Sequence, residues 1–326
     1  MPFFIALLFT LAAQTPPNRY VCPRAPKPIR IDGRIDSQWK NAPWTTRFVD
    51  IEGDAKPQPR FRTRAKMLWD DEYFYVAAEM EEPHVWGTLT QHDAVIFHDN
   101  DFEVFVDPNG DSHEYFEFEM NALNTGWDLF LPKPYKDGGS ADNGWEIPGL
   151  RTTVKVNGTL NNPSDVDKGW TLEIAIPWNA FGQAACMPLP PKSGDTWRVN
   201  FSRVEWRHEL RQGKYARIPG TKEDNWVWSP QGKVNMHLPE HWGYVRFSAK
   251  ARGGETFPGD PAWATRMRLQ AYYRKQVDFQ KAQRRWATAS ELPPGQGMEL
   301  RPAPDGAWRA CSEGLCIAAD AKIERD

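Results

Sequence analysis

Apolar and polar residues alternate with a period of two in several short segments of this chain, which indicates a fold built from β-strands. One pair of predicted strands is Asp101–Val106 and His113–Asn121, joined by the turn sequence Asp107–Asp111. A second pair, Phe61–Trp69 and Tyr73–Met80, meets at a polar turn and predicts a hairpin. Further strands are predicted at Trp127–Leu131, Arg151–Val156, Gly169–Ile176, Thr196–Val204 and Trp242–Phe247.

Proline and tryptophan content agrees with this interpretation. The 28 prolines argue against a mostly helical chain, because an interior proline breaks a helix. The 16 tryptophans suit a β-rich protein, where most of them would pack in the core. We therefore predict an all-β protein, a β-sandwich with jelly-roll or Greek-key connections and a small C-terminal helical extension.

Composition divides the chain into four segments. Residues 1–14 contain an apolar run that is typical of a signal peptide and too short to span a bilayer. Residues 15–248 hold the predicted strands, and the Gly- and Pro-rich residues 249–261 predict a linker. Residues 262–326 predict an α+β extension, with a helix over Ala262–Ala289 and then a small hairpin. This organisation predicts an exported protein, secreted or periplasmic, without a membrane span in its mature form.

The four cysteines favour disulfides, because an even number in an exported chain is usually paired. Three pairings are possible. We predict a Cys311–Cys316 bridge, since the residues between them can form a turn, and this leaves Cys22 and Cys186 as the second pair. A zinc site is disfavoured, because the cysteine spacing is not C-x₂-C and no histidine pair lies nearby.

Charge and motifs exclude several classes of function. The net charge is -3 and no long Lys/Arg run is present, which argues against a nucleic-acid partner. The sequence contains no Gly-rich phosphate loop, no G-x-S-x-G, no H-E-x-x-H and no dinucleotide-binding fingerprint. No catalytic residue is predicted, and a binding protein is favoured over an enzyme.

The two central strands are expected to carry acidic side chains on one sheet face. Alternation brings five polar side chains to the same side: Asp101, Glu103, Glu117, Glu119 and Asn121. Carboxylates this close repel one another unless something offsets their charge. The offset could come from Arg203 or Arg207, from a calcium ion, or from the hydroxyl groups of a sugar stacked on aromatic rings. A solvated acidic surface with internal arginine pairs is the alternative interpretation.

Three other chemistries use residues in the same region. A glycoside hydrolase would need two carboxylates from the set Asp101, Glu103, Glu117 and Glu119. A structural calcium ion could be held by Asp99, Asp101 and Glu103, or by the turn residues that we predict as the metal site, Asp107, Asn109 and Asp111. A haem-binding electron-transfer sandwich would take its axial ligands from Met80, Met120, His84 and His98.

Six sequence blocks, in this order, resemble the family 9 carbohydrate-binding modules in their broad family 9-like branch. They span roughly Tyr20 to Ser248 and read IRIDGRIDSQWKNAPW, RAKMLWDDEYFYVAAEMEEPHVW, HDNDFEVFVDPNGDSHEYFEFEMNALNTGWDL, GWTLEIAIPW, WRVNFSRVEW and NWVWSPQGKVNMHLPEHWGYVRFS. The resemblance implies a jelly-roll β-sandwich, export, and binding of a sugar or glycan, with structural calcium in some members.

The resemblance also implies positions for the binding residues. The family's binding glutamate matches Glu103, and the tryptophan shortly before it is matched by Phe97. The arginine on the following strand falls at Glu119, and the second tryptophan falls near Met236. Alternation and resemblance together predict these ligand-binding residues: Phe97, Asp101, Glu103, Glu119, Asn121 and Arg203. The expected function is carbohydrate binding, non-catalytic or accessory to polysaccharide breakdown.

Overall fold

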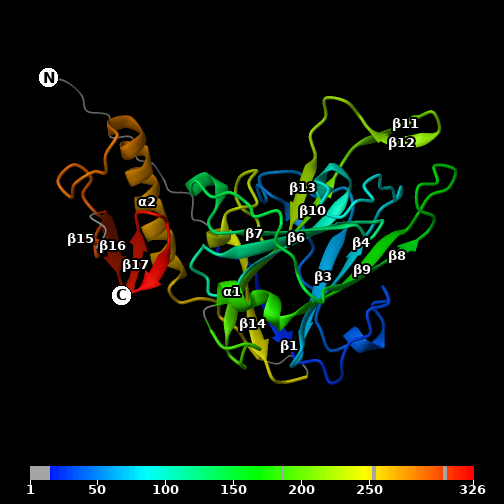
Figure 1. Ribbon diagram of the computed structural model, residues 1–326, viewed down its shortest axis with the longest axis horizontal. Helices are drawn as coiled ribbons and strands as arrows, with labels where there is room; N and C mark the ends of the chain where they lie inside the picture. The colour runs from blue at the N-terminus through cyan, green and yellow to red at the C-terminus, as the bar shows by residue number, and fades with distance from the viewer. Residues whose placement is uncertain (1–14, 186, 252–254, 304–306) are drawn as a thin grey trace.

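The computed structural model describes residues 15–185, 187–251, 255–303 and 307–326, and β-sheets make up most of it (Figure 1). The predicted signal peptide and Cys186 lie outside the described residues. The largest sheet contains β1 (Arg19–Pro23), β2 (Val49–Asp50), β5 (Asp101–Asp107), β6 (Tyr115–Asn121), β7 (Gly126–Leu131), β10 (Thr196–Glu205), β13 (Asp224–Val227) and β14 (Gly243–Ser248). Its order is β1-β14-β10-β5-β6-β7, with β13 beside β10 and β2 beside β13.

A second sheet packs against the first. It consists of β3 (Thr63–Trp69), β4 (Tyr73–Met80), β8 (Arg151–Asn157) and β9 (Gly169–Pro177), in the order β3-β4-β9-β8. A separate hairpin is formed by β11 (His208–Arg211) and β12 (Lys214–Arg217) and extends from one end of the body (Figure 1). The connections contain short helical turns: η1 (Ser37–Trp39), η2 (Ile96–His98), η3 (Tyr135–Asp137), η4 (Trp178–Phe181), α1 (Gly182–Ala185) and η5 (Pro239–His241).

The main core lies between the two sheets. On β5, Phe102, Val104 and Val106 are fully buried and belong to one apolar cluster with side chains of the second sheet, such as Leu172. The period of two predicts this inward set, because successive side chains of a strand point to opposite faces. The neighbours β4 and β9, and likewise β5 and β10, are not consecutive in the chain, as Greek-key connections require. The predicted β-sandwich is confirmed.

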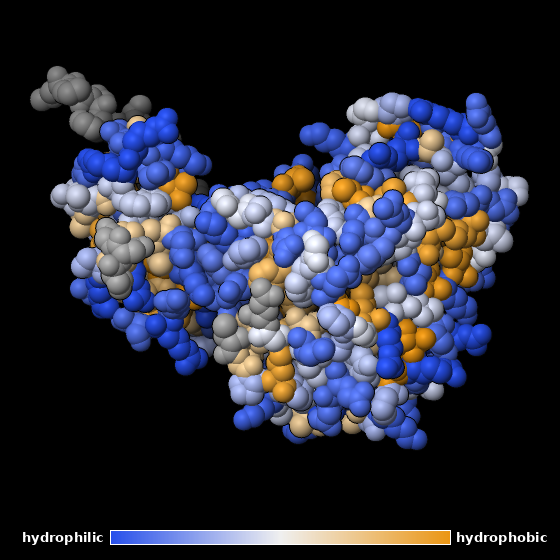
Figure 2. Space-filling view, viewed as in Figure 1, coloured by the Kyte–Doolittle hydropathy of each residue, from blue (hydrophilic) through white to orange (hydrophobic). Residues whose placement is uncertain are grey.

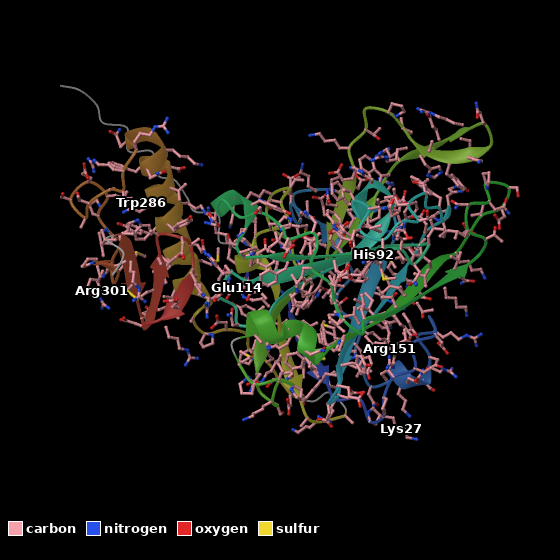
Figure 3. All side chains as sticks on the ribbon, in the orientation of Figure 1. Lys27, His92, Glu114, Arg151, Trp286 and Arg301 are labelled. Atoms are coloured by element: carbon pink, nitrogen blue, oxygen red, sulfur yellow. A yellow bond between two sulfur atoms is a disulfide. The ribbon has the colours of Figure 1, made fainter. Side chains whose placement is uncertain are left out.

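The C-terminal extension has a core of its own. Helix α2 (Trp263–Gln283) packs on a four-stranded sheet of β15 (Glu299–Pro302), β16 (Trp308–Ser312), β17 (Leu315–Ala318) and β18 (Ile323–Arg325). Leu269 and Tyr272 of the helix are buried in one cluster with Trp308. Trp286, labelled in Figure 3, packs edge-on against Trp308 with ring centres 5.7 Å apart.

Two boundaries of the extension differ from the sequence prediction. Helix α2 ends at Gln283 rather than Ala289, because Arg284 adopts a left-handed conformation with φ of 59° that ends the helix. The predicted hairpin is present as β16 and β17, but β15 and β18 widen it to a four-stranded sheet. The extension forms a lobe beside the sandwich, and the visible surface of both is mainly hydrophilic with small apolar patches (Figure 2).

The two predicted disulfides have different outcomes. The Cys311–Cys316 bridge is present and links β16 to β17. The predicted Cys22–Cys186 bridge is wrong, because Cys22 is a free cysteine. Its side chain is fully buried in the core between the sheets, and burial raises the pKa of the thiol well above its ordinary value. Cys22 is therefore an apolar core residue, since a neutral thiol packs like a small hydrophobic group.

Within the described residues, none of the helices combines the length and the apolar character that a membrane crossing requires.

Candidate functional site

Strands β5 and β6 bring acidic side chains together on the sheet face that points away from the main core. The strands are antiparallel, with Asp101 opposite Asn121, Glu103 opposite Glu119, and Phe105 opposite Glu117. One carboxylate oxygen from each of Asp101, Glu103 and Glu119 lies within 4.8 Å of the other two. The shared acidic face predicted from the alternation is therefore present.

A cavity of about 370 Å³ opens on this face. Glu103, Glu117 and Glu119 line it together with two aromatic pairs. Phe97 and Trp127 are stacked with ring centres 6.5 Å apart, and Tyr135 meets His237 edge-on at 4.5 Å. The remaining lining residues are Ile51, Leu129, Val204, Glu223, Asn225, Val234, Asn235 and Met236. We call this space the acidic cavity.

The pKa values of the carboxyl groups in the acidic cavity are raised above their ordinary range. Burial, with repulsion from Glu223, raises the pKa of Glu103 to about 7. Burial and the charge of Glu103 also raise the pKa values of Glu117 and Glu119 well above the ordinary range. Removal from water penalises the charged form, and each neighbouring negative charge adds to that penalty. These carboxyl groups therefore titrate as a coupled set, and they lose their protons at a higher pH than isolated carboxyl groups do.

Backbone hydrogen bonds satisfy only some of the carboxyl oxygens in this cluster. Glu119 accepts a hydrogen bond from the Phe97 backbone N–H at 2.9 Å, and Asp101 accepts one from Val204 N–H at 3.1 Å. Oε2 of Glu103 and Oδ2 of Asp101 are buried and have no hydrogen-bond partner among the described residues. A buried oxygen without a partner is destabilising, so Oε2 of Glu103, which lines the acidic cavity, is available to a ligand that can donate hydrogen bonds.

No cationic side chain offsets the charge in the acidic cavity, as far as the described lining residues go. His237 is neutral, because burial and the charge of Lys136 lower its pKa to about 4. Its Nδ1 atom lies 3.0 Å from the Tyr115 hydroxyl. Lys136 itself is paired with the buried Glu240. The lining of the acidic cavity therefore carries a net negative charge at any pH at which its carboxyl groups are ionised.

The structure brings together only part of the predicted ligand set. Phe97, Glu103 and Glu119 line the acidic cavity, and Met236, the fourth position implied by the resemblance, lines it as well. Asp101 belongs to the same carboxylate cluster but is fully buried and is not a lining residue.

Asn121 does not line the acidic cavity, and its side chain has a structural role. Its amide nitrogen donates to the Leu89 carbonyl at 2.8 Å and to Asp99 at 3.0 Å. Its side-chain oxygen accepts hydrogen bonds from the backbone N–H groups of Leu123 and Thr125. These bonds shape the β6–β7 turn, and they use the side chain fully.

The predicted position of Arg203 is wrong. Arg203 follows the same alternation along β10 as Val199 and Phe201, which belong to the main core, so its side chain lies on the inner face. There it pairs with Glu82 at 2.6 Å and with Glu205 at 2.8 Å. The alternation along β10 already contains this information, because Arg203 shares the parity of its apolar neighbours.

The predicted set lacks most of the lining residues, among them Glu117, Trp127, Tyr135 and His237. Glu117 was assigned to the acidic face but not to the binding set. Trp127 faces Glu119 across the β6–β7 hairpin, so the short turn between these strands was the available signal. Tyr135 and His237 come from loops far apart in the sequence, and no local pattern indicates that they meet.

The turn predicted to bind metal is closed by its own hydrogen bonds. Asp107 accepts bonds from the backbone N–H groups of Gly110 at 2.8 Å and Ser112 at 2.9 Å. Asn109 donates to Asp111 at 3.0 Å, and Asp111 also pairs with Lys322 of the extension at 3.3 Å. These contacts account for the side chains of the turn, and calcium binding there stays a prediction.

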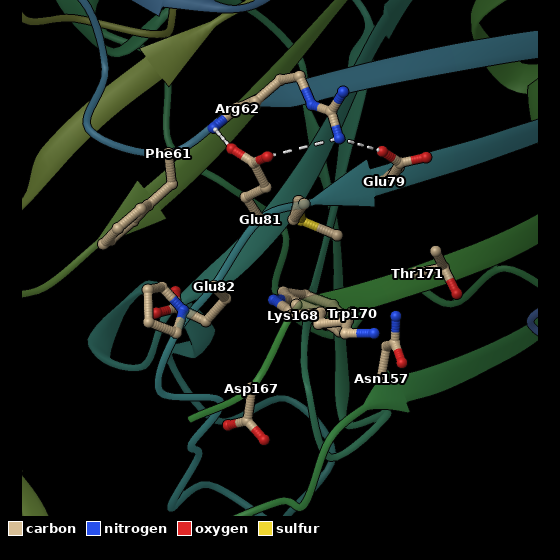
Figure 4. A pocket seen from close by; sticks show the side chains of 13 residues that line it. Phe61, Arg62, Glu79, Glu81, Glu82, Asn157, Asp167, Lys168, Trp170 and Thr171 are labelled. Carbon is tan, nitrogen blue, oxygen red and sulfur yellow. Dashed lines mark hydrogen bonds and ion pairs between the residues drawn. The ribbon is translucent and has the colours of Figure 1, made fainter. Parts of the chain in front are cut away.

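A larger cavity, of about 650 Å³, lies where β4 and β8 end and β9 begins (Figure 4). Arg62 lies at one edge of it and pairs with Glu79 at 2.7 Å and with Glu81 at 3.5 Å. Trp170 lines it, but the ring is buried in the main core and is only 2% exposed. Because Glu79, Glu81 and Glu82 are paired with arginine and the tryptophan is covered, this cavity is the weaker candidate for a ligand site.

The C-terminal extension holds one wall of the acidic cavity. Arg274 of α2 donates two hydrogen bonds to Asp137, at 2.6 and 3.1 Å, and the Tyr273 hydroxyl donates a third at 3.1 Å. Asp137 is the last residue of η3, and the first, Tyr135, lines the acidic cavity. The extension therefore fixes the loop that carries Tyr135.

Replacing Arg274 with alanine should loosen this loop. Loss of a charge-assisted pair that stabilises it by roughly 1.5–3 kcal/mol should speed amide hydrogen exchange over residues 135–138 about tenfold or more. Exchange is measured by mass spectrometry on the intact protein. Arg285→Ala removes the exposed pair with Glu291 and serves as the control. Unchanged exchange over residues 135–138 in Arg274→Ala would show that the loop holds itself.

Three comparisons bear on the family of this chain. Residues 31–190 match the model of the carbohydrate family 9 binding domain-like family. An exoglucanase XynX from Acetivibrio thermocellus is 27% identical over 151 residues, which cover 46% of this chain and 12% of that enzyme. Endo-1,4-beta-xylanase A from Thermoanaerobacterium saccharolyticum is 26% identical over 152 residues, covering 46% of this chain and 11% of the enzyme. The match thus spans only a small part of both curated relatives.

A solved structure has the same fold. A candidate carbohydrate-binding protein from Bacteroides uniformis superposes with a TM-score of 0.52 at 17% identity, and the match covers 71% of this chain and all of that one. At this identity the likeness concerns the fold alone. The family match and the β-sandwich agree, and residues 31–190 of this chain belong to the carbohydrate family 9 binding domain-like family.

Proposed function

We propose that the sandwich binds a saccharide in the acidic cavity and catalyses no reaction on it. One observation carries the proposal: the half-buried rings of Phe97 and Trp127 line the same small cavity as the buried carboxyl groups of Glu103 and Glu119. The apolar face of a sugar ring packs on aromatic rings, and its hydroxyl groups donate hydrogen bonds to carboxylate oxygens. The cavity volume lies at the low end of the roughly 300–1,000 Å³ of small-molecule sites, which suits a short saccharide or a chain end.

An accessory part in polysaccharide breakdown is the wider role that we propose. The curated relatives are named as an exoglucanase and an endo-1,4-beta-xylanase, and only about a tenth of each is similar to this chain. Such a segment would hold the enzyme or its partner at a glycan. Export fits this role, and the Cys311–Cys316 bridge supports it because disulfides persist mainly in oxidising compartments.

The geometry disfavours the two alternative functions. One oxygen from each of Asp101, Glu103 and Glu119 lies within 4.8 Å of the other two, so these carboxyl groups form one cluster, whereas an inverting hydrolase keeps its two carboxyl groups about 6.5–9.5 Å apart. The methionines considered as haem ligands, Met80 and Met120, are buried in the main core, which accounts for them as packing residues. Binding without catalysis is therefore the function that we favour.

Glu103→Ala should weaken saccharide binding about tenfold to a hundredfold, because it removes a buried acceptor that has no hydrogen-bond partner in the described part of the chain. A glycan array on the purified protein first identifies a ligand, and titration calorimetry then compares the variants. Asn157→Ala, an exposed residue at the larger cavity, is the matched control and should bind like the wild type. If Glu103→Ala binds normally while Asn157→Ala does not, the acidic cavity is the wrong site.

A further inference from the structure

We propose that the acidic cavity selects a saccharide that carries a positive charge, an amino sugar with a free ammonium group. The inference rests on the proposed function and adds the class of sugar to it. It is based on the charge of the lining residues, on the buried oxygens without partners, and on the aromatic rings that enclose the same space.

The first support is the charge of the lining. Glu103, Glu117, Glu119 and Glu223 line the acidic cavity, and no lysine or arginine does so among the described residues. His237 adds no positive charge, because burial holds it neutral. A neutral sugar would do nothing to stabilise the ionised form of these carboxyl groups, whereas an ammonium group would stabilise it.

The second support is that the nearby cations are already committed. Lys136 of η3 is paired with Glu240, and both side chains are mostly buried. Arg203 lies on the inner face of the sheet, between Glu82 and Glu205. Neither can turn to the acidic cavity without leaving a buried carboxylate unpaired, which is strongly destabilising. The positive charge must therefore come from a ligand.

The third support is the unpaired oxygen within the cluster. Glu103 is only 5% exposed, it lines the acidic cavity, and its Oε2 atom has no hydrogen-bond partner among the described residues. An ammonium group donates three hydrogen bonds, and those to a carboxylate are among the strongest in proteins. Oδ2 of Asp101, also without a partner, lies in the same cluster.

The aromatic rings favour an organic cation over a bare metal ion. Phe97, Trp127 and Tyr135 line the acidic cavity beside the carboxyl groups, so part of its wall is aromatic. Aromatic faces attract ammonium groups and also pack on the apolar face of a sugar ring. A hard divalent cation takes about six to eight oxygens and gains nothing from such rings.

The test compares three monosaccharides on the whole protein by titration calorimetry near pH 6.5, in the presence of a chelator. Glucosamine should bind at least about tenfold more tightly than glucose, and than N-acetylglucosamine, whose substituent is uncharged. Binding of glucosamine should also release protons, because the pKa values of the buried carboxyl groups are raised and a nearby ammonium group lowers them. Proton release is measured by repeating the titration in buffers of different ionisation enthalpy.

Glu119→Gln keeps the shape of the side chain and removes one negative charge, so the preference for glucosamine should fall severalfold while binding of glucose changes little. Glu117→Gln should act in the same direction and covers the case in which the first variant fails to fold. Glu81→Gln, a half-exposed residue at the larger cavity, should leave the preference unchanged.

Each remaining outcome overturns a stated part of the argument. Equal or tighter binding of glucose would refute the amino-sugar inference and leave the proposed function standing. Tight binding of calcium chloride, titrated alone and without the chelator, lost in Glu119→Gln and accompanied by no sugar preference, would identify a metal site instead. Failure of every saccharide, including all those on the array, would refute the proposed function itself.

Discussion

Replacing Phe102 with alanine should lower the free energy of unfolding by roughly 3–5 kcal/mol, the usual loss for a phenylalanine removed from a packed core. Phe102 is fully buried between the sheets. Its ring stacks on Phe201 at 5.6 Å and on Phe48 at 6.1 Å. Alanine would leave a cavity that the surrounding strands cannot close, because their positions are set by the hydrogen bonds of both sheets.

Urea unfolding followed by tryptophan fluorescence measures this loss. Phe102→Leu keeps most of the volume and should lose clearly less stability. Val166→Ala, at a side chain that is 75% exposed, should stay within about 0.5 kcal/mol of the wild type. If Phe102→Ala unfolds like Val166→Ala, the inner and outer faces of β5 are inverted and the acidic cavity is misplaced with them.

The second large effect is a loss of stability as the pH rises from about 4.5 to 7. Burial and the charge of Glu223 raise the pKa of Glu103 from 4.5 to about 7, so the folded protein binds its proton more tightly than the unfolded chain does. Stability from such a group is complete below pH 4.5 and is lost as the pH rises through the folded-state pKa. The displacement corresponds to roughly 3 kcal/mol for Glu103 alone.

Glu103→Gln removes this titration, so the variant should be more stable than the wild type at pH 8 and similar to it at pH 4.5. Unfolding in urea across this range measures the difference. Glu240→Gln is the control with the opposite sign: burial opposes ionisation there, but the charges of Lys136 and His241 lower the pKa of Glu240 to about 2. That variant should lose stability at neutral pH. A Glu103→Gln curve parallel to that of the wild type would show that Glu103 titrates normally.

The faces of individual strands followed from the sequence, because alternation is a local property. Phe102 and Glu103 are adjacent and point to opposite sides, and a short turn fixes the register of β5 against β6. The same rule places Arg203 on the inner face with Phe201, but the charge balance of the acidic face led to the opposite prediction. Alternation outweighs charge there, because Glu82 and Glu205 supply the missing partners on the inner side.

The prediction of a Cys22–Cys186 disulfide was wrong for a related reason. Counting cysteines pairs them by elimination, whereas a bridge requires two β-carbons about 3.5–4.5 Å apart. Cys311 and Cys316 meet across β16 and β17, with α-carbons 4.0 Å apart, because five positions along a tight hairpin bring them face to face. Cys22 points into the core from β1, where its neighbours are apolar. Burial among apolar side chains therefore leaves Cys22 as a free thiol.

The sequence by itself determined the β-sandwich, its inward-facing residues and the acidic strip on β5 and β6, since each depends on residues close together in the chain. Only the tertiary structure decided that this strip is the floor of a cavity. Trp127 lies on β7, and His237 lies in the loop before β14. Tyr135 lies in η3, which is held by the hydrogen bonds from Arg274 to Asp137. These side chains meet because long-range packing closes loops that are about a hundred residues apart, and no local periodicity encodes such contacts.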